Sequence, residues 1–309
     1  MQKTFQLSNF PTSYCHKYAF TLVEIAIVIV IIGLIIGGVL VGRDLISSAE
    51  IRSQISQIEQ YNTAVHTFRL KYNALPGDMA ASEVAAVGFT ASVPRAGTIG
   101  EGNGNSILEG ICCGGGNNSK YLQHGETVWF WSDLSVNSGL ISGNFKYATA
   151  TPTIADNVWS TTSITYPISK ELPSAKIGNS NYITVYSVNA DEHYYIISKI
   201  TQIDGNGAPY AVSSLALSSQ QVYAIDSKMD DGLPQSGKIK AQYVLWAPGH
   251  YNLTWAAGNG SIGSSSTAAT QASDTTCYDN GNVAGATQQY SVGYNGGTAL
   301  NCALSFRFQ

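Results

Sequence analysis

Charged side chains are scarce in this chain. Lys, Arg, Asp and Glu make up only 12% of its 309 residues, and 20 acidic against 16 basic residues give a formal net charge of −4 at pH 7. A protein that binds nucleic acid without sequence preference needs an excess of basic residues to neutralise phosphates. The composition therefore argues against nucleic acid as a partner.

The local signatures of catalysis are also missing. The chain has no Gly-x-Ser-x-Gly, His-Glu-x-x-His, P-loop or Cys-x-x-Cys motif. Its five histidines are far apart from one another: His16, His66, His124, His193 and His250. We therefore expect a protein that is not an enzyme and has no cofactor, apart from the calcium ion considered below.

One apolar run interrupts the otherwise polar chain. Residues 25–42 carry no charged side chain, and a helix of this length crosses a bilayer at about 1.5 Å per residue. Glu24 precedes the run directly, and a carboxylate in a membrane helix is tolerated only if it is neutralised, paired or kept at the interface. Either Glu24 reaches interfacial water, or a positive group arrives to meet it.

The residues around Glu24 carry a family resemblance. The stretch Ala19-Phe20-Thr21-Leu22-Val23-Glu24, followed by a β-branched apolar run and a polar amphipathic continuation, resembles the prepilin N-terminal motif of type IV pilins and type II secretion pseudopilins. The resemblance implies that a peptidase cuts between Ala19 and Phe20 and that the new amine of Phe20 is methylated. It also implies that Glu24 pairs with a neighbouring subunit's N-terminus during assembly. The family normally has Gly before the cut, and Ala19 is another small residue.

The resemblance also implies where the protein is found and what it meets. Residues 1–19 would be a leader, and its Lys3 and Lys17, without any acid, hold this end in the cytoplasm. Residues 20–42 would span the inner membrane among its lipids, with the remainder in the periplasm and then in a pilus or pseudopilus. The expected partners are the prepilin peptidase and methyltransferase, other pilin or pseudopilin subunits and an inner-membrane assembly platform.

The helical pattern continues beyond the apolar run. Apolar residues recur at steps of three, four and seven, as on one face of an α-helix: Ile51, Ile55, Ile58, Val65, Phe68 and Tyr72. Pro76-Gly77-Asp78 is a strong stop signal. We therefore expect one long helix within residues 20–75 and a globular, pilin-like head over residues 76–309.

Four glycines lie in the apolar half of this helix: Gly33, Gly37, Gly38 and Gly42. They give two overlapping G-x-x-x-G spacings, which allow helices to approach closely in an apolar medium. The alternative is that small residues only relieve crowding among the many Ile and Val side chains.

The head has the pattern of an α+β fold. Segments 182–188, 193–200, 238–247 and 303–308 are rich in Val, Ile, Tyr and Phe and are bounded by turn residues, which predicts strands. Ser218 and Gln221 form a capping box before apolar Val222 and Ile225, which predicts a helix. The resemblance implies that the long N-terminal helix packs on a mainly antiparallel sheet.

Three further stretches of the head have distinct compositions. Residues 126–137 predict a short helix whose bulky aromatics, Trp129, Phe130 and Trp131, are either core residues or a flat binding platform. The Gly-rich and Asn-rich residues 97–119 predict a long exposed loop. Residues 258–301 are of low complexity and predict a flexible loop or an extended surface excursion.

Four cysteines would remain once the leader and its Cys15 are removed. In a compartment that permits disulfides, four cysteines allow three pairings. Many pilins close a C-terminal loop with a disulfide, so the resemblance implies a bond between Cys277 and Cys302. Cys112 and Cys113 would then form a strained vicinal bond or stay reduced.

Three acids gather near the end of the helix that Ser218 begins: Asp226, Asp230 and Asp231. Negative charge there has the wrong sign for the helix dipole, so we expect a positive group to offset it. That group is either a lysine, Lys228 or Lys238, or a calcium ion, which takes six to eight oxygen ligands.

These features together predict a structural subunit. We expect a minor pilin or pilin-like protein of a type IV pilus, because the head is large for a major subunit. A pseudopilin of a type II secretion system shares the same motif and is the alternative within the family. A monomeric membrane-tethered binding protein is the alternative from another class, and a simple tether has no use for a buried carboxylate at Glu24.

Processing at the motif gives the first prediction. The mature protein is expected to begin with N-methylated Phe20, and mass spectrometry of its N-terminal peptide measures this directly. A mature N-terminus at Met1, or one beyond Gly42, would contradict the resemblance on which the membrane and assembly expectations rest.

Overall fold

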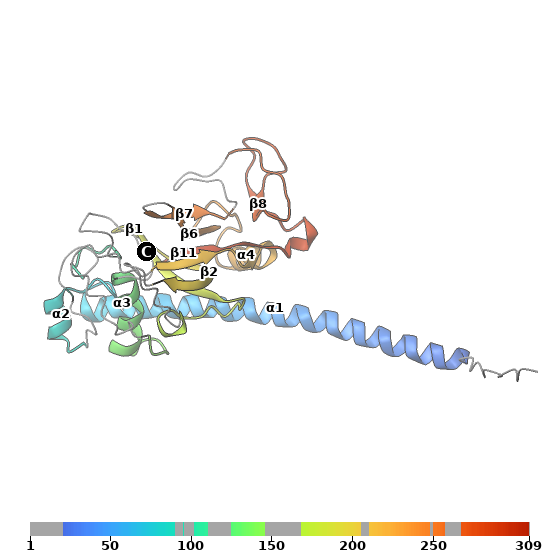
Figure 1. Ribbon diagram of the computed structural model, residues 1–309, viewed down its shortest axis with the longest axis horizontal. Coiled ribbons are helices and arrows are strands. Elements are labelled where there is room, and N and C mark those ends of the chain that lie inside the picture. Colours follow the sequence, from blue (N-terminus) through green and yellow to red (C-terminus); the bar gives the residue numbers. More distant parts are fainter. Residues whose placement is uncertain are drawn as a thin grey trace, which may run out of the picture. The chain divides into compact units, whose positions relative to one another are not determined.

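The structure is a computed structural model that describes residues 21–89, 95, 102–110, 125–145, 168–204, 210–247, 250–256 and 267–308. The chain forms two compact units, Met1–Ser47 and Ser48–Gln309. The division falls within one continuous helix, α1 (Leu22–Tyr72), which is blue in Figure 1. The expected long helix is confirmed.

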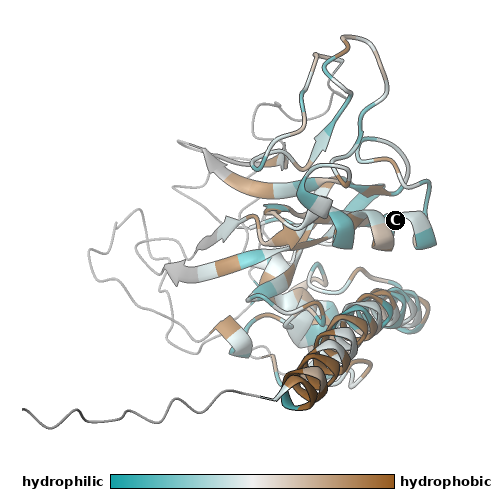
Figure 2. Cartoon of the chain, turned by 90° about the vertical axis from the view of Figure 1, so that its right-hand side faces the viewer, coloured by the Kyte–Doolittle hydropathy of each residue, from teal (hydrophilic) through white to brown (hydrophobic). Residues whose placement is uncertain are grey.

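The described part of the first unit is the apolar half of α1. Residues 21–41 are all exposed, and Figure 2 shows this half of the helix as mainly brown, hydrophobic surface. Within the described ranges, α1 is the one helix long and apolar enough to cross a membrane. Its side chains therefore need apolar surroundings that the described residues do not supply.

From Ser48 onward, α1 belongs to the head and buries one face. Ile51, Ile58, Val65 and Phe68 are buried, while Ile55 and Tyr72 are partly buried against the same core. The predicted apolar stripe is therefore confirmed. Asn73, with a φ of 51°, ends the helix in the left-handed conformation that commonly follows a helix C-terminus, before Pro76 is reached.

Two glutamines on the buried face of α1 hold the segment that leads into the sheet. Gln57 donates to the carbonyl of Ser174 at 3.0 Å and accepts from the amide of Lys176 at 3.2 Å. Gln54 accepts from the amide of Ile177 at 3.2 Å. These side chains satisfy backbone groups that burial would otherwise leave unpaired.

The head is built on a five-stranded antiparallel sheet, which confirms the α+β fold class. Its strands are β1 (Asn181–Asn189), β2 (Glu192–Asp204), β3 (Tyr210–Ser214), β5 (Ile239–Lys240) and β11 (Leu304–Arg307). The long β2 is central, because Ile197 pairs with Ile183 of β1 and with Leu304 of β11. The strand β3 pairs with the second half of β2, and β5 pairs with β11.

Shorter elements surround this sheet. The helices are α2 (Ala81–Ala86), α3 (Glu126–Ser132), which continues into a π-helical turn at Asp133–Asn137, and α4 (Ser219–Met229). Short 3-10 turns cover Ile168–Lys170 and Asn295–Gly297. Three antiparallel pairs complete the described elements: β4 (Leu217–Ser218) with β10 (Leu300–Cys302), β6 (Gln242–Ala247) with β7 (His250–Trp255), and β8 (Tyr278–Asp279) with β9 (Gln289–Tyr290).

An aromatic cluster joins α1, α3 and the sheet. The rings of Tyr61 and Trp131 lie 5.1 Å apart, edge to face, and those of Tyr195 and Phe308 are stacked at 4.2 Å. Phe130 contacts both Trp131 and Tyr195. The aromatics of α3 are therefore core residues and not an exposed binding platform.

Two expectations for the head need correction. The strand expected over 238–247 is split at Ala241, whose amide donates to Pro234 and whose carbonyl accepts from Ala256, so that β5 and β6 enter different sheets. In the loop expected to be exposed over 97–119, Leu108 and Glu109 are buried. The remainder of that loop outside 102–110 lies beyond the described residues.

The packing of α1 on the head predicts the effect of two substitutions one turn from its end. Phe68 is 0% exposed and Leu70 is 88% exposed. Phe68→Ala should therefore lower the free energy of unfolding by about 3–5 kcal/mol, while Leu70→Ala should change it by less than about 0.5 kcal/mol. Urea unfolding of the detergent-solubilised full chain, followed by tryptophan fluorescence, measures both. Equal effects would contradict the assigned face.

Candidate functional site

The helix α1 begins behind a capping box. Glu24 Oε2 accepts from the backbone N–H of Thr21 at 2.7 Å and from its hydroxyl at 2.8 Å, while Thr21 Oγ1 accepts from the amide of Glu24 at 3.2 Å. A Thr followed three residues later by Glu, just before an apolar run, is the sequence signature of this motif. The sequence reasoning missed it here. Ala19 and Phe20 lie outside the described residues.

Glu24 remains open to a partner in this arrangement. The residue is exposed, and its Oε1 accepts no hydrogen bond from the described part of the chain. The carboxylate also lies in the first turn of α1, where the helix dipole favours negative charge. It can therefore receive a cationic donor while Thr21 holds the other oxygen.

The glycines of the apolar half have no packing role within the described chain. A Cβ built on Gly33, Gly37, Gly38 or Gly42 meets nothing within 4 Å. The described residues therefore leave the surface at these four glycines open.

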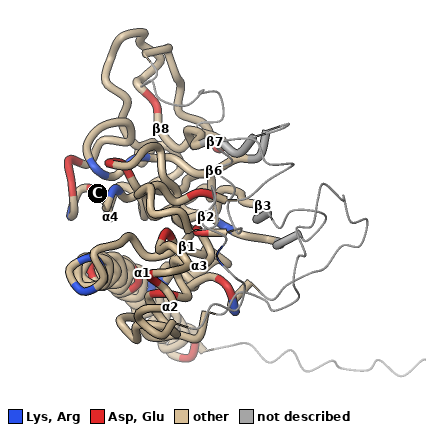
Figure 3. The backbone as a smooth tube through the Cα atoms, turned by 90° about the vertical axis from the view of Figure 1, so that its left-hand side faces the viewer, with Lys and Arg blue, Asp and Glu red and all other residues tan. Residues whose placement is uncertain are grey.

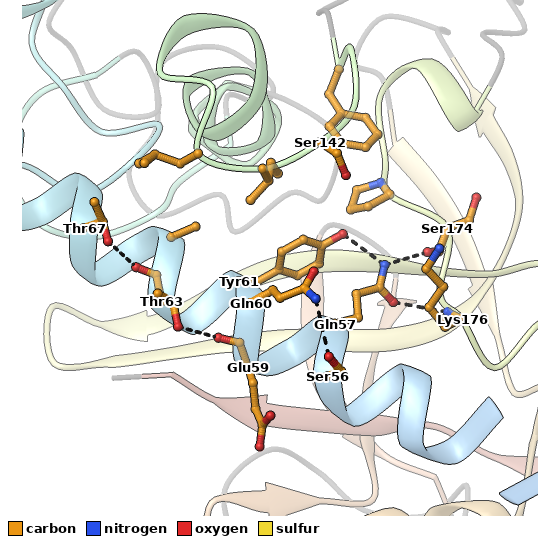
Figure 4. Close-up of a pocket in the computed structure, with 15 residues that line it drawn as sticks. Ser56, Gln57, Glu59, Gln60, Tyr61, Thr63, Thr67, Ser142, Ser174 and Lys176 are labelled. Atoms are coloured by element: carbon orange, nitrogen blue, oxygen red, sulfur yellow. Dashed lines mark hydrogen bonds between the residues drawn. The ribbon is translucent and has the colours of Figure 1, made fainter. Parts of the chain in front are cut away.

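A polar groove of about 710 Å³ runs along the head half of α1. Figure 4 shows Ser56, Gln60, Thr63 and Thr67 along the helix, facing Ser142. The hydroxyls of Thr63 and Thr67 donate to carbonyls one turn earlier in the same helix, at 2.9 and 2.7 Å. The described lining holds no nucleophile paired with a base, so the groove offers hydrogen-bonding surface without a catalytic arrangement.

The C-terminal disulfide is present, between Cys277 and Cys302. It closes the segment that contains β8 and β9, and a loop of 25 residues contributes about 3 kcal/mol on the chain-entropy model. Ser219 at the start of α4 donates to the carbonyl of Cys277 at 3.2 Å. Cys112 and Cys113 lie outside the described residues.

The three acids at the end of α4 do lie together. Figure 3 shows acidic positions, in red, near the label of this helix. One carboxylate oxygen from each of Asp226, Asp230 and Asp231 falls within 4.8 Å of the others. Asp226 is fully buried and accepts from the hydroxyl of Tyr290 at 2.7 Å. Burial is the main reason why the pKa of Asp226 is raised to about 7, and the charges of Asp231 and Asp230 contribute to the rise. The hydrogen bonds from Tyr290 and from the amide of Gly232 act in the opposite direction.

The expected pairing of these acids with a lysine side chain is wrong. Within the described chain neither Lys228 nor Lys238 forms an ion pair with them. Asp230 instead accepts from the backbone amides of Lys238 and Ile239. Gly237 makes this approach possible, because a Cβ there would lie 1.9 Å from Asp230 Oδ2.

A second group of buried charges was not expected from the sequence. Asp78, Glu109 and Glu126 are at most 3% exposed. Nearby, Arg95 pairs with Asp133 at 2.6 Å, and this pair is also buried. Isolated acids scattered over fifty residues give no sequence signal of common burial, so only the fold reveals the group.

Comparison with known proteins gives one match. Residues 15–40 fit the family model described as the prokaryotic N-terminal methylation motif. No curated protein and no solved structure matches the chain. The chain thus carries the N-terminal signature shared by type IV pilins and pseudopilins, which is typical of structural subunits, processed by a prepilin peptidase and assembled with other pilin subunits.

The acids of α4 give a prediction for calcium, whose binding there is a proposal. The clustered oxygens suit calcium, and extracellular sites bind it at about 0.1–1 mM. At 10 mM calcium the head should then gain about 1–3 kcal/mol and melt at a higher temperature than with chelator. Asp230→Asn with Asp231→Asn should remove the difference. Identical melting of the unsubstituted chain with calcium and with chelator would leave the acids as ligands of backbone amides only.

Proposed function

Because the chain carries the N-terminal methylation motif, we propose that it is a minor pilin or pilin-like subunit of a type IV pilus. After cleavage before Phe20, the apolar half of α1 anchors the protein in the inner membrane. The same helix then enters a filament with helices of other subunits. The head is carried on the filament surface.

The exposed half of α1 is the observation that carries this proposal. Its apolar side chains have no partner in the described chain, although a folded protein rarely leaves so large an apolar surface uncovered. Lipid satisfies this surface before assembly and neighbouring helices satisfy it afterwards. The open positions at Gly37 and Gly38 suit such close helix contacts.

Glu24 supplies the specific contact in the proposed assembly. Its Oε1 accepts no hydrogen bond from the described residues, and an N-terminal amine of another subunit is a cation of the right size and reach. In an apolar filament core, a carboxylate without such a partner is costly to bury. The pairing therefore favours one axial position of each new subunit over others.

A pseudopilin of a type II secretion system would use the same contacts. We favour the pilus because the head unit, Ser48–Gln309, is large for a repeating major subunit and suits a minor one. Recovery of the protein in pili sheared from cells supports the first assignment. Loss of protein secretion on deletion of the gene, with pili intact, supports the second.

The role of Glu24 is tested with two variants of the same capping box. Glu24→Ala removes the carboxylate and should reduce the chain's incorporation into sheared filaments at least tenfold. Thr21→Val removes only the hydroxyl that holds Glu24 within its own chain and should leave incorporation within twofold. Immunoblotting of sheared and membrane fractions gives the ratio.

Mass spectrometry of Phe20 in each variant separates assembly from processing. Both variants should retain the N-methylated Phe20. Normal incorporation of Glu24→Ala would contradict the assembly role and favour a membrane-tethered monomer.

A further inference from the structure

Residues 102–110 are attached to the head mainly through carboxylates. The amides of Gly102 and Glu109 donate to the two oxygens of Glu126, each at 2.8 Å. The amides of Gly104 and Ser106 donate to the two oxygens of Asp78, at 2.9 and 2.6 Å. This segment has no helix or strand of its own. Two backbone–backbone bonds add to its attachment, from the amide of Gly104 to the carbonyl of Asp78 and from the amide of Glu126 to the carbonyl of Glu109.

The third acid of the group lies in the segment itself. Glu109 is 3% exposed and accepts from the side-chain amide of Asn105 at 3.1 Å. The closed segment thus places its own carboxylate near Asp78 and Glu126. The charge of Glu109 raises the pKa of both of these acids, and the charge of Asp78 also raises the pKa of Glu126.

Among the described residues, no cation pairs with these three acids. Arg95 lies close to Gly102, but its guanidinium is bound to Asp133 and to the carbonyls of Gly77 and Met79. Asp133 also accepts from the amide of Gly77 at 2.7 Å. The Arg95–Asp133 pair is therefore internally balanced, and the three remaining carboxylates are buried without a partner of opposite charge among the described residues.

One other titratable group reaches the segment. The amide of Leu108 donates to Ser187 Oγ at 2.9 Å, and this hydroxyl contacts His193 Nδ1 at 2.6 Å. Burial lowers the pKa of His193 to about 4. The imidazole is therefore neutral above pH 5 and does not compensate the acids.

We propose that Asp78, Glu109 and Glu126 form a proton-dependent latch. The latch holds residues 102–110 on the head while Asp78 and Glu126 retain protons, and it releases the segment when both of them ionise beside Glu109. Opening admits water to the carboxylates and separates Glu109 from the other two. The latch is independent of the proposed assembly through α1.

The direction of the pH dependence follows from burial. Burial, with the neighbouring charges, raises the pKa of Glu126 to about 8, and burial raises that of Asp78 to about 6. When the segment opens and water reaches Asp78 and Glu126, the pKa values of both acids return toward ordinary values near 4. The closed form therefore holds protons that the open form lacks. Its advantage is complete in acid and is lost as the pH rises through about 8.

Hydrogen exchange on the detergent-solubilised full chain tests the latch. The amides of Gly102, Gly104, Ser106 and Glu109 are followed at pH 6 and pH 9, each rate divided by the intrinsic rate at that pH. Their protection should fall by about tenfold to a hundredfold. The amide of Ile197, in the centre of the sheet, should keep its protection over the same range.

Glu109→Gln removes the negative charge of this side chain but keeps its hydrogen bonds. Its side-chain carbonyl can still accept from Asn105, and its backbone amide still donates to Glu126. Without the third charge, the fall in protection between pH 6 and pH 9 should shrink at least threefold. Glu59→Gln, an exposed acid on α1, is the matched control and should leave the fall unchanged.

Three results would overturn the latch. The first is equal protection of the four amides at pH 6 and pH 9. The second is an equal loss at Ile197, which would mean that the whole head opens. The third is a Glu109→Gln variant whose protection changes by the same factor at pH 6 and at pH 9, since a residue with a purely structural role would have this effect.

Discussion

The burial of one face of α1 between Ile51 and Phe68 is the interaction on which the head depends. Phe68 and Ile58 are enclosed, and Tyr61 contacts both Trp131 of α3 and Tyr195 of the sheet. The helix is thus the element against which α3 and the sheet both pack. Since Gln54 and Gln57 also fix the segment before β1, α1 sets the position of the sheet's first strand as well as its core contacts.

Sequence reasoning succeeded where the signal was periodic and long. The stripe on α1, the capping box of α4 and the strand-forming composition of β1 and β2 follow from local rules, and each of these elements is present. It failed where the local structure depends on contacts with residues that are distant in the sequence. The split at Ala241 depends on Pro234 and Ala256, and the burial of Glu109 depends on α3. The capping box at Thr21 and Glu24 has a clear sequence signature, so it too was predictable from local rules.

Buried acids in this head are solvated by backbone amides more than by cations. Buried Asp78 and Glu126 each accept from two main-chain N–H groups, as does the partly buried Asp230, whereas the only ion pair among the described residues is Arg95–Asp133. With few basic residues in the chain, amides of irregular segments supply the donors. The same bonds give order to segments that have no ladder of their own. The scarcity of positive charge and the irregular backbone are therefore linked, because amides outside helices and strands donate to the acids that basic side chains do not reach.

The closed C-terminal segment has a different consequence. The disulfide at Cys277 fixes this segment next to β8, and the hydrogen bond from the hydroxyl of Tyr290 to Asp226 fixes it at β9. Residues 281–285, between these two strands, are exposed. Substitutions in that exposed stretch remove no contact from the core. Side-chain changes at Val283 and Ala284 therefore leave the scaffold of the segment intact, whereas Gly281, Asn282 and Gly285 are constrained by their positive φ.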